Sequence, residues 1–301
     1  MKRILLLFIA LAAVWGAAAK IRLPEIIGND MVLQQNAEVR LWGWAEPYAA
    51  VKVETSWGAG AAVKSDAEGR WVVSVRTPAG SYEPQRITFA SGDRVTFDRV
   101  LIGEVWFAGG PSTMEMPLAG YWQCPVADPN EIIASAGATS RKLHYVKIPH
   151  AAAYMPQDRT AGSWTPCMTA TAAKFTAAGY FFAEMLNDVL GVPVGIIDCS
   201  WGGSRVESWM SREVLSGYSD IDLTEEGISR VAQHLRPMVM YNAMLRPVAG
   251  YTVRGFLWYQ GESNVGRYMD YAARLSDMVS LWRGLWGRDD LPFYYVEIAP
   301  F

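Results

Sequence analysis

The sequence predicts an α/β protein whose parallel sheet is flanked by helices and preceded by an antiparallel β-sandwich. Three observations support this prediction. Short segments with period-two alternation and turn signals between them fill residues 20–98. Continuous apolar strands alternate with amphipathic helices over residues 99–301. A chain with 51% hydrophobic and 19% charged residues has the composition of a globular protein.

The chain begins with the layout of a secretory signal peptide over residues 1–19. Lys2 and Arg3 supply positive charge, residues 4–15 form an apolar run, and residues 17–19 offer a small-residue cleavage site. The apolar run is shorter than the roughly 20 residues that a membrane-spanning helix needs. We therefore expect a periplasmic or extracellular protein that keeps no membrane span after the signal is removed.

Charge and cysteine usage narrow the classes of partner and cofactor. The 27 basic residues against 30 acidic ones give a net charge of −3, which argues against nucleic acid as a partner. No spacing of cysteine and histidine is typical of a metal site, so we expect no metal cofactor. Cys124 and Cys167 lie in proline-flanked stretches and can form a disulfide, whereas Cys199 ends an apolar run and is expected to be buried.

The strands of the first domain alternate apolar and polar residues and are separated by turn signals. The strongest turn signal is Asp66–Gly69, which precedes one of the strands. We expect strands at Val39–Trp44, Val51–Thr55, Gly69–Val75, Arg86–Phe89 and Arg94–Phe97. This part of the sequence shows no helical period and no cluster of catalytic side chains.

The second domain alternates apolar strands with two helices. The strands are expected at Val100–Ile102 with Val105–Ala108, Val194–Ser200, Val253–Tyr259 and Phe293–Ile298. The first helix is expected over Ala172–Leu190, with Phe175, Ala178, Phe182, Met185, Leu186 and Val189 facing inward. The second is expected over Tyr268–Trp286, with Tyr268, Tyr271, Leu275, Met278, Val279, Trp282 and Leu285 facing inward. Gly191 and Gly287 end the two helices.

Glycine-bearing polar loops follow three of these strands, at 109–114, 201–207 and 260–264. The carboxyl ends of parallel strands share one edge of a sheet, where ligands bind, so the loops should meet. A serine on a tight turn, such as Ser112, can act as a nucleophile, and amides such as Gln260 or Asn264 can donate to an oxyanion. Taken singly, Ser112 is more typical of a turn or a helix N-cap than of a nucleophile, and Glu262 could be a surface carboxylate. Their convergence favours a site.

The three loops carry motifs that resemble those of a known family. They read Gly-Pro-Ser-Thr-Met-Glu-Met-Pro-Leu at 110–118, Ser-Trp-Gly-Gly-Ser-Arg-Val-Glu-Ser-Trp at 200–209 and Trp-Tyr-Gln-Gly-Glu-Ser-Asn at 258–264. This set resembles the sialate O-acetylesterase family of the SGNH-hydrolase group, to which the acetylxylan esterases are closely related. Segments 29–35, 240–244 and 291–296 also resemble family segments, so the likeness covers the mature chain.

The resemblance implies roles for several residues. Ser112 matches the nucleophile, and its N–H, the N–H of Gly203 and the side chain of Gln260 or Asn264 would form the oxyanion hole. Glu262 would hold its loop in place, through Arg205. The implied reaction removes O-acetyl groups from sialic acid or another acetylated glycan through an acetyl-serine and needs no cofactor. Independently of the resemblance, Trp122 follows Ser112 in a loop and is the tryptophan that best fits a sugar platform.

Two departures from the family pattern shape the functional prediction. Pro111 and Thr113 stand where the family has glutamine and asparagine. None of the three histidines lies in an Asp-x-x-His motif, which holds the base of the family. We expect His144 and His150 in a strand and its exit loop, and His234 in a solvent-facing polar stretch.

Two classes of function follow. The first is a secreted esterase whose C-terminal part is incomplete and which lacks most of the family's catalytic power as it stands. The second is a non-catalytic glycan-binding relative that keeps the cleft without the triad. An acetylxylan-type esterase is the remaining alternative.

Overall fold

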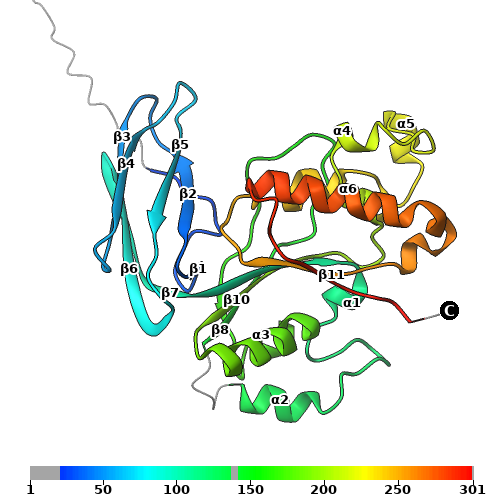
Figure 1. Cartoon of the computed structure of the whole chain (residues 1–301), viewed down its shortest axis with the longest axis horizontal. Helices are drawn as coiled ribbons and strands as arrows, with labels where there is room; N and C mark the ends of the chain where they lie inside the picture. The colour runs from blue at the N-terminus through cyan, green and yellow to red at the C-terminus, as the bar shows by residue number, and fades with distance from the viewer. Residues whose placement is uncertain (1–20, 137–141, 300–301) are drawn as a thin grey trace, which may run out of the picture.

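The fold was determined as a computed structural model that describes residues 21–136 and 142–299. It is the expected α/β fold, with a mostly parallel sheet between helices (Figure 1). An antiparallel β-unit, here called the front unit, precedes this sheet in the sequence and lies beside it. The expected signal peptide lies outside the described residues. Within the described ranges, no helix combines the length and the apolar character needed to cross a membrane.

The front unit consists of two antiparallel layers. One layer pairs β2 (Glu38–Trp44) with β5 (Arg70–Arg76). The other has the order β4-β3-β6-β7, and its strands are β3 (Ala50–Thr55), β4 (Gly60–Lys64), β6 (Ser81–Ser91) and β7 (Asp93–Gly110). Alternate residues of both layers, among them Leu41, Val53 and Phe89, are buried between them. The five expected strands are present. Strand β4 was not predicted, because its residues are mostly small and none of them is fully buried at the sheet edge.

Strand β7 runs without interruption from the front unit into the parallel sheet. Its first half pairs antiparallel with β6, and its second half pairs parallel with β10 and β11. The short β1 (Val32–Gln34) also pairs with it in parallel. The expected boundary between the two domains, at residues 98 and 99, falls inside this strand. The division into two domains stays a prediction.

The parallel sheet places β7 at its centre. Its order is β12-β11-β7-β10-β8-β9, with β8 (Leu143–Lys147), β9 (Thr165–Pro166), β10 (Val194–Ser200), β11 (Gly255–Tyr259) and β12 (Phe293–Val296). All of these pair in parallel except β9. Helix α3 (Ala177–Leu190) covers one face and α6 (Tyr268–Trp286) covers the other (Figure 1).

Short helices form the connections around the sheet. The α-helical ones are α1 (Ser112–Glu115), α2 (Pro129–Ser135), α4 (Arg212–Leu215) and α5 (Glu225–Ser229). The others are η1 (Ala172–Lys174), η2 (Val206–Trp209), η3 (Gln233–Leu235), η4 (Tyr241–Leu245) and η5 (Glu262–Arg267). His144 lies in β8 and His150 in the loop after it, as expected.

The first long helix begins later than expected and buries a different face. Thr176 caps α3 by accepting the N–H of Gly179, and extended backbone at Phe175 separates the helix from η1. Tyr180, Ala183 and Asn187 are buried, whereas Met185 and Val189 are 67% and 71% exposed, so their expected inward position was wrong. Ala178, Phe182 and Leu186 of the expected stripe are partly buried and pack against the core, but the fully buried face also takes small and polar residues such as Gly179 and Asn187.

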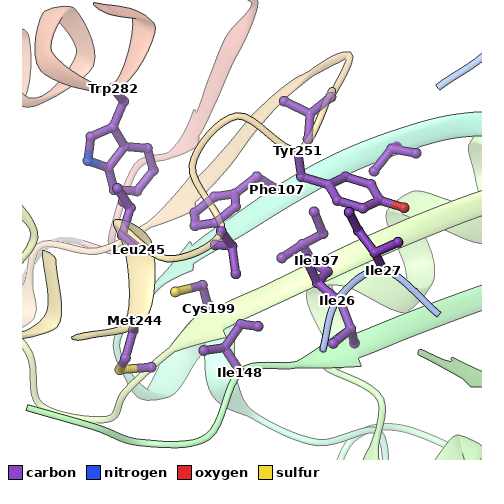
Figure 2. Packing of buried hydrophobic residues seen from close by; sticks show 14 of the residues in the cluster. Ile26, Ile27, Phe107, Ile148, Ile197, Cys199, Met244, Leu245, Tyr251 and Trp282 are labelled. Atoms are coloured by element: carbon purple, nitrogen blue, oxygen red, sulfur yellow. The ribbon is translucent and has the colours of Figure 1, made fainter. Parts of the chain in front are cut away.

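The second long helix has the expected bounds. Met278 and Trp282 are fully buried against the central strands, but Tyr268 is 71% exposed, so its expected inward position was wrong. Arg274 is also fully buried on this helix, which its charge did not suggest. Figure 2 shows Trp282 and Phe107 in a continuous core that extends past Cys199 and Ile197.

The cysteines make no disulfide. Cys199 is buried, as expected. Cys124 is exposed in a tight turn and Cys167 is buried after β9; both are free, so the bridge that their loops allowed is not formed. Burial raises the pKa of the Cys167 thiol to about 12.

Candidate active site

The three glycine-bearing loops meet at one edge of the sheet, as their order in the sequence predicted. In the register of the sheet, Gly110 at the end of β7 lies beside Ser200 at the end of β10. Trp258 of β11 lies beside Gly109 on the other side. The loops therefore leave three adjacent parallel strands at nearly the same level.

Ser112 is presented on a sharp turn directly after β7. Gly110 has a φ of +146°, and a Cβ there would lie 2.3 Å from the carbonyl oxygen of Tyr259, so the turn requires glycine. Ser112 is exposed at the first position of α1, where Pro111 takes the N-cap position, so the serine is not the helix cap. Its hydroxyl makes no hydrogen bond with any described residue.

Tyr121 supports this turn. Its hydroxyl donates to the carbonyl of Ser112 at 3.3 Å. Burial and the nearby Glu115 raise the pKa of Tyr121 to about 12, so the phenol stays protonated at neutral pH. The next residue, Trp122, is 90% exposed.

Glu115 connects the serine turn to the second loop, a contact that sequence reasoning missed. One of its carboxylate oxygens accepts the N–H of Gly202 at 2.6 Å. The other bonds the Nε2 of His150 at 2.6 Å and the Nζ of Lys147 at 3.3 Å. His150 in turn stacks on Trp201, with ring centroids 4.5 Å apart. The sequence signal that could have predicted this contact is the position of Glu115, three residues after Ser112 and one helical turn away from it.

Gly203 occupies a backbone conformation that disfavours side chains. Its φ is +76°, and a Cβ would lie 2.8 Å from Cδ2 of His234. His234 is therefore half-buried against the loop, and its expected solvent-facing position was wrong. The carbonyl of Gly203 accepts the Ser263 hydroxyl at 2.8 Å, which joins the second loop to the third.

Gln260 and Asn264 form a buried amide pair beneath the loops. Nε2 of Gln260 donates to Oδ1 of Asn264 at 2.7 Å and to the carbonyl of Ser204 at 3.3 Å. Asn264 also accepts the N–H of Val206 at 3.1 Å. Its Nδ2 donates to Glu207 at 3.0 Å. Both Nε2 hydrogens of Gln260 are thus engaged, while Asn264 keeps one Nδ2 hydrogen unassigned among the described residues.

A buried ion network supports this pair from below. Arg274 of α6 bonds Glu207, and its other nitrogen lies 2.7 Å from both carboxylate oxygens of Asp220. Its guanidinium also lies 5.0 Å from the centre of the Tyr218 ring. Burial acts to lower the pKa of Arg274, but the two carboxylates outweigh burial and raise it. Arg274 therefore stays charged and orients Glu207 toward Asn264.

Arg205 and Glu262 lie at the border of the second and third loops. Nε of Arg205 donates to the carbonyl of Ser263 at 3.2 Å. One oxygen of Glu262 is buried without a hydrogen-bond partner among the described residues. The Arg205 side chain therefore contacts the backbone of the third loop. No hydrogen bond or ion pair joins it to Glu262 in the described part of the chain.

Asp198 is a buried carboxylate on β10 below the serine turn. Burial raises its pKa to about 6, although Lys147 at 3.7 Å and the Ser200 hydroxyl act in the opposite direction. A carboxyl whose pKa is raised on folding binds a proton more tightly in the folded state. Its contribution to stability is therefore complete below about pH 4 and is lost as the pH rises through about 6.

We expect Asp198→Asn to remove this pH dependence. The free energy of unfolding of the wild type, relative to the variant, should fall by about 2 kcal/mol between pH 4 and pH 7.5. Denaturant unfolding at a series of pH values measures this difference. Asp289→Asn, at an exposed position, is the control and should show no such trend. A flat difference for Asp198→Asn would contradict the assignment.

Comparisons with known proteins find relatives that are similar in sequence and in fold. Residues 153–301 match the family model described as carbohydrate esterase, sialic acid-specific acetylesterase. The sialate O-acetylesterase of Mus musculus is 25% identical over 336 residues, which covers 95% of this chain and 61% of the relative. That of Homo sapiens is 28% identical over 314 residues, covering 94% and 58%.

A solved structure shows the same likeness. A carbohydrate acetylesterase from Xanthomonas citri is 34% identical and has a TM-score of 0.80, over 92% of this chain and 60% of that protein. The chain thus spans about three fifths of the length of the relatives it matches.

Proposed function

The chain is a relative of the sialate O-acetylesterases, and from this premise we propose that it is a serine esterase that removes O-acetyl groups from sialic acid or a related glycan. The observation that supports this most is the placement of Ser112. Ser112 is exposed directly after the central strand and lies beside the loop that contains Gly202. A Cβ built on Gly202 would lie 3.6 Å from the Cβ of Ser112. A hydroxyl in this position can reach a carbonyl that is held by the loop N–H groups.

In the proposed reaction, the Ser112 oxygen attacks the acetyl carbonyl carbon and loses its proton. The N–H groups of Ser112 and Gly203 stabilise the oxyanion, and Asn264 is the better side-chain donor, since the Nε2 hydrogens of Gln260 are engaged. The sugar alcohol leaves with a proton, and water then releases acetate from the acetyl-serine.

The Ser112 proton needs a base, and we assign that role to no residue of this chain. His144 is buried in β8 and bonds the carbonyl of Asp30. His150 bonds Glu115, and His234 packs on Gly203. The proposed roles of Glu262 and Arg205 are limited to holding the third loop.

One observation favours a second candidate function, a glycan-binding protein without turnover. The Ser112 hydroxyl has no hydrogen-bond partner among the described residues, so nothing there activates it. Acetate release from 9-O-acetylated sialic acid separates the two functions, with acetylated xylan as the second substrate. Release from the sialic acid alone supports the proposal. Release from xylan alone assigns an acetylxylan-type esterase, and binding without release assigns the binding protein.

We propose that Trp122 is a sugar platform next to the nucleophile. Its ring is 90% exposed, and its neighbour Tyr121 contacts the Ser112 backbone. Trp122→Ala should raise KM several-fold for a glycan-borne acetyl ester and leave 4-nitrophenyl acetate turnover unchanged, because the small ester has no sugar to stack. Tyr48→Ala, on the β-sandwich, is the control with an exposed ring. Equal effects on both esters would contradict the platform role.

The proposed site of action is outside the cytoplasm, because residues 1–19 have the layout of a signal peptide. N-terminal sequencing of the exported protein tests this. A mature chain beginning at Lys20 supports export, and an intact Met1 in the cytoplasmic fraction contradicts it.

A further inference from the structure

The outer face of the β2–β5 layer carries arginine and tryptophan side chains at alternate positions. Arg40, Trp42 and Trp44 point to this face from β2, and Arg70 lies opposite Trp44 on β5. They line a cavity of about 240 Å³ whose other wall includes Asp158 and Arg246. The cavity is lined by β2, β5 and residues 157–158 and 246–249, whereas α1, which begins at Ser112, follows the carboxyl end of β7 away from β2 and β5 (Figure 1).

The positive charges of this cavity are only partly balanced. Arg70 and Asp158 form an ion pair at 3.7 Å. Neither Arg40 nor Arg246 has a carboxylate partner or a side-chain hydrogen bond among the residues that the structure describes. Arg40 lies over the Trp42 ring at 5.7 Å and against Gly250, where a Cβ would lie 1.9 Å from its Nη1. Its guanidinium is thus held in place by packing rather than by an acid.

The two unpaired guanidinium groups line the same cavity. Burial lowers the pKa of Arg40, and the charge of Arg246 lowers it further. Like charges held together without a counter-charge favour an anion between them, and guanidinium groups bind carboxylates with paired hydrogen bonds. Half-buried Trp42 and Trp44 lie beside these donors, with Arg40 over the Trp42 ring and Arg159 over the Trp44 ring, each at 5.7 Å.

We propose that this cavity is a second sugar site that binds a carboxylate-bearing residue of a glycan, such as a sialic or uronic acid. The carboxylate lies between Arg40 and Arg246, and the rest of the sugar lies beside the tryptophans. The site is separate from the proposed esterase centre. It tethers an acidic glycan to the protein, which raises the effective concentration of the chain's other acetylated residues near Ser112.

Isothermal titration calorimetry with sialyllactose tests this site, with lactose as the neutral match. We expect sialyllactose to bind and lactose to bind at least tenfold more weakly, because only the former offers a carboxylate. Arg40→Gln and Arg246→Gln should each weaken sialyllactose binding about tenfold, which is the size of one charged hydrogen bond. Binding should also weaken in 0.5 M salt, since the groups are near the surface.

Controls separate this site from the esterase centre. Arg94→Gln makes the same charge change on the opposite layer and should leave binding unchanged. Ser112→Ala should bind sialyllactose like the wild type, so binding can be found even if the protein proves inactive as an esterase. Arg40→Gln should leave 4-nitrophenyl acetate turnover unchanged.

Three outcomes would overturn the inference. The first is equal binding of lactose and sialyllactose, and the second is full binding in both arginine variants. The third is binding of inorganic phosphate as tight as that of sialyllactose, which would make the site a general anion site. Oligogalacturonate in place of sialyllactose identifies which acidic sugar the site prefers.

Discussion

Replacement of Ser112 by alanine is expected to lower acetate release from an O-acetylated substrate to the uncatalysed background, because the covalent step loses its nucleophile. The change removes one exposed oxygen that bonds no described residue, so the fold and the binding of the glycan should be retained. The measurement is kcat/KM for acetate release by wild type and variant. The thermal midpoint of unfolding is measured in parallel.

Ser135→Ala is the matched control for this experiment. The Ser135 hydroxyl bonds only the carbonyl of Ile132 within its own helix, so this variant should keep the wild-type rate. If Ser112→Ala released acetate at the wild-type rate, Ser112 would not be the nucleophile. If the wild type also released none while binding the substrate, the binding-protein function would replace the esterase.

The second large effect is expected at Arg274, which is fully buried between Glu207 and Asp220. Arg274→Met should destabilise the protein by about 3–5 kcal/mol, because the buried Glu207 carboxylate loses its hydrogen-bonded cation and keeps only the more distant Arg267, at 3.8 Å. Glu207 is then held less firmly against Asn264, so we also expect a lower kcat in any variant that folds. Denaturant unfolding and steady-state kinetics measure the two effects.

Two further variants test the cause of this loss. Arg274→Met combined with Glu207→Gln should recover part of the stability, since the unpaired charge is then gone. Arg288→Met breaks an exposed ion pair with Asp290 and should cost less than about 1 kcal/mol. If Arg274→Met cost no more than Arg288→Met, the buried network would have no structural role.

The edge at which the candidate site lies could be predicted from sequence because parallel strands share a direction. Apolar strands that end at residues 110, 200 and 259 must deliver their following loops to one side of the sheet. Ser112 is the candidate nucleophile at this edge because Gly110 and Pro111, directly before it, are typical turn residues. The inward face of the helix before Gly191 could not be predicted in the same way, since its fully buried face includes Gly179, Ala183 and Asn187, which an apolar stripe does not mark.

The contacts of the site that could not be predicted from sequence join segments that are far apart in the chain. Glu115 is 87 residues from Gly202, whose N–H it accepts, and Arg274 is 67 residues from Glu207. Each of these side chains alone has the pattern of an ordinary surface charge on a helix. Their burial is decided by carboxylates and amides that arrive from other loops, which a local pattern does not encode.

The sequence by itself determined the α/β class, most strand positions, the three converging loops and the family resemblance, because periodicity and turn chemistry are local properties. Only the tertiary structure decided that Glu115 binds the glycine loop and that His234 rests on Gly203. It also decided that Arg274 holds the amide pair and that Arg40 and Arg246 share a cavity. These relations arise from packing between segments far apart in the chain, where burial and charge pairing depend on what the fold brings into contact.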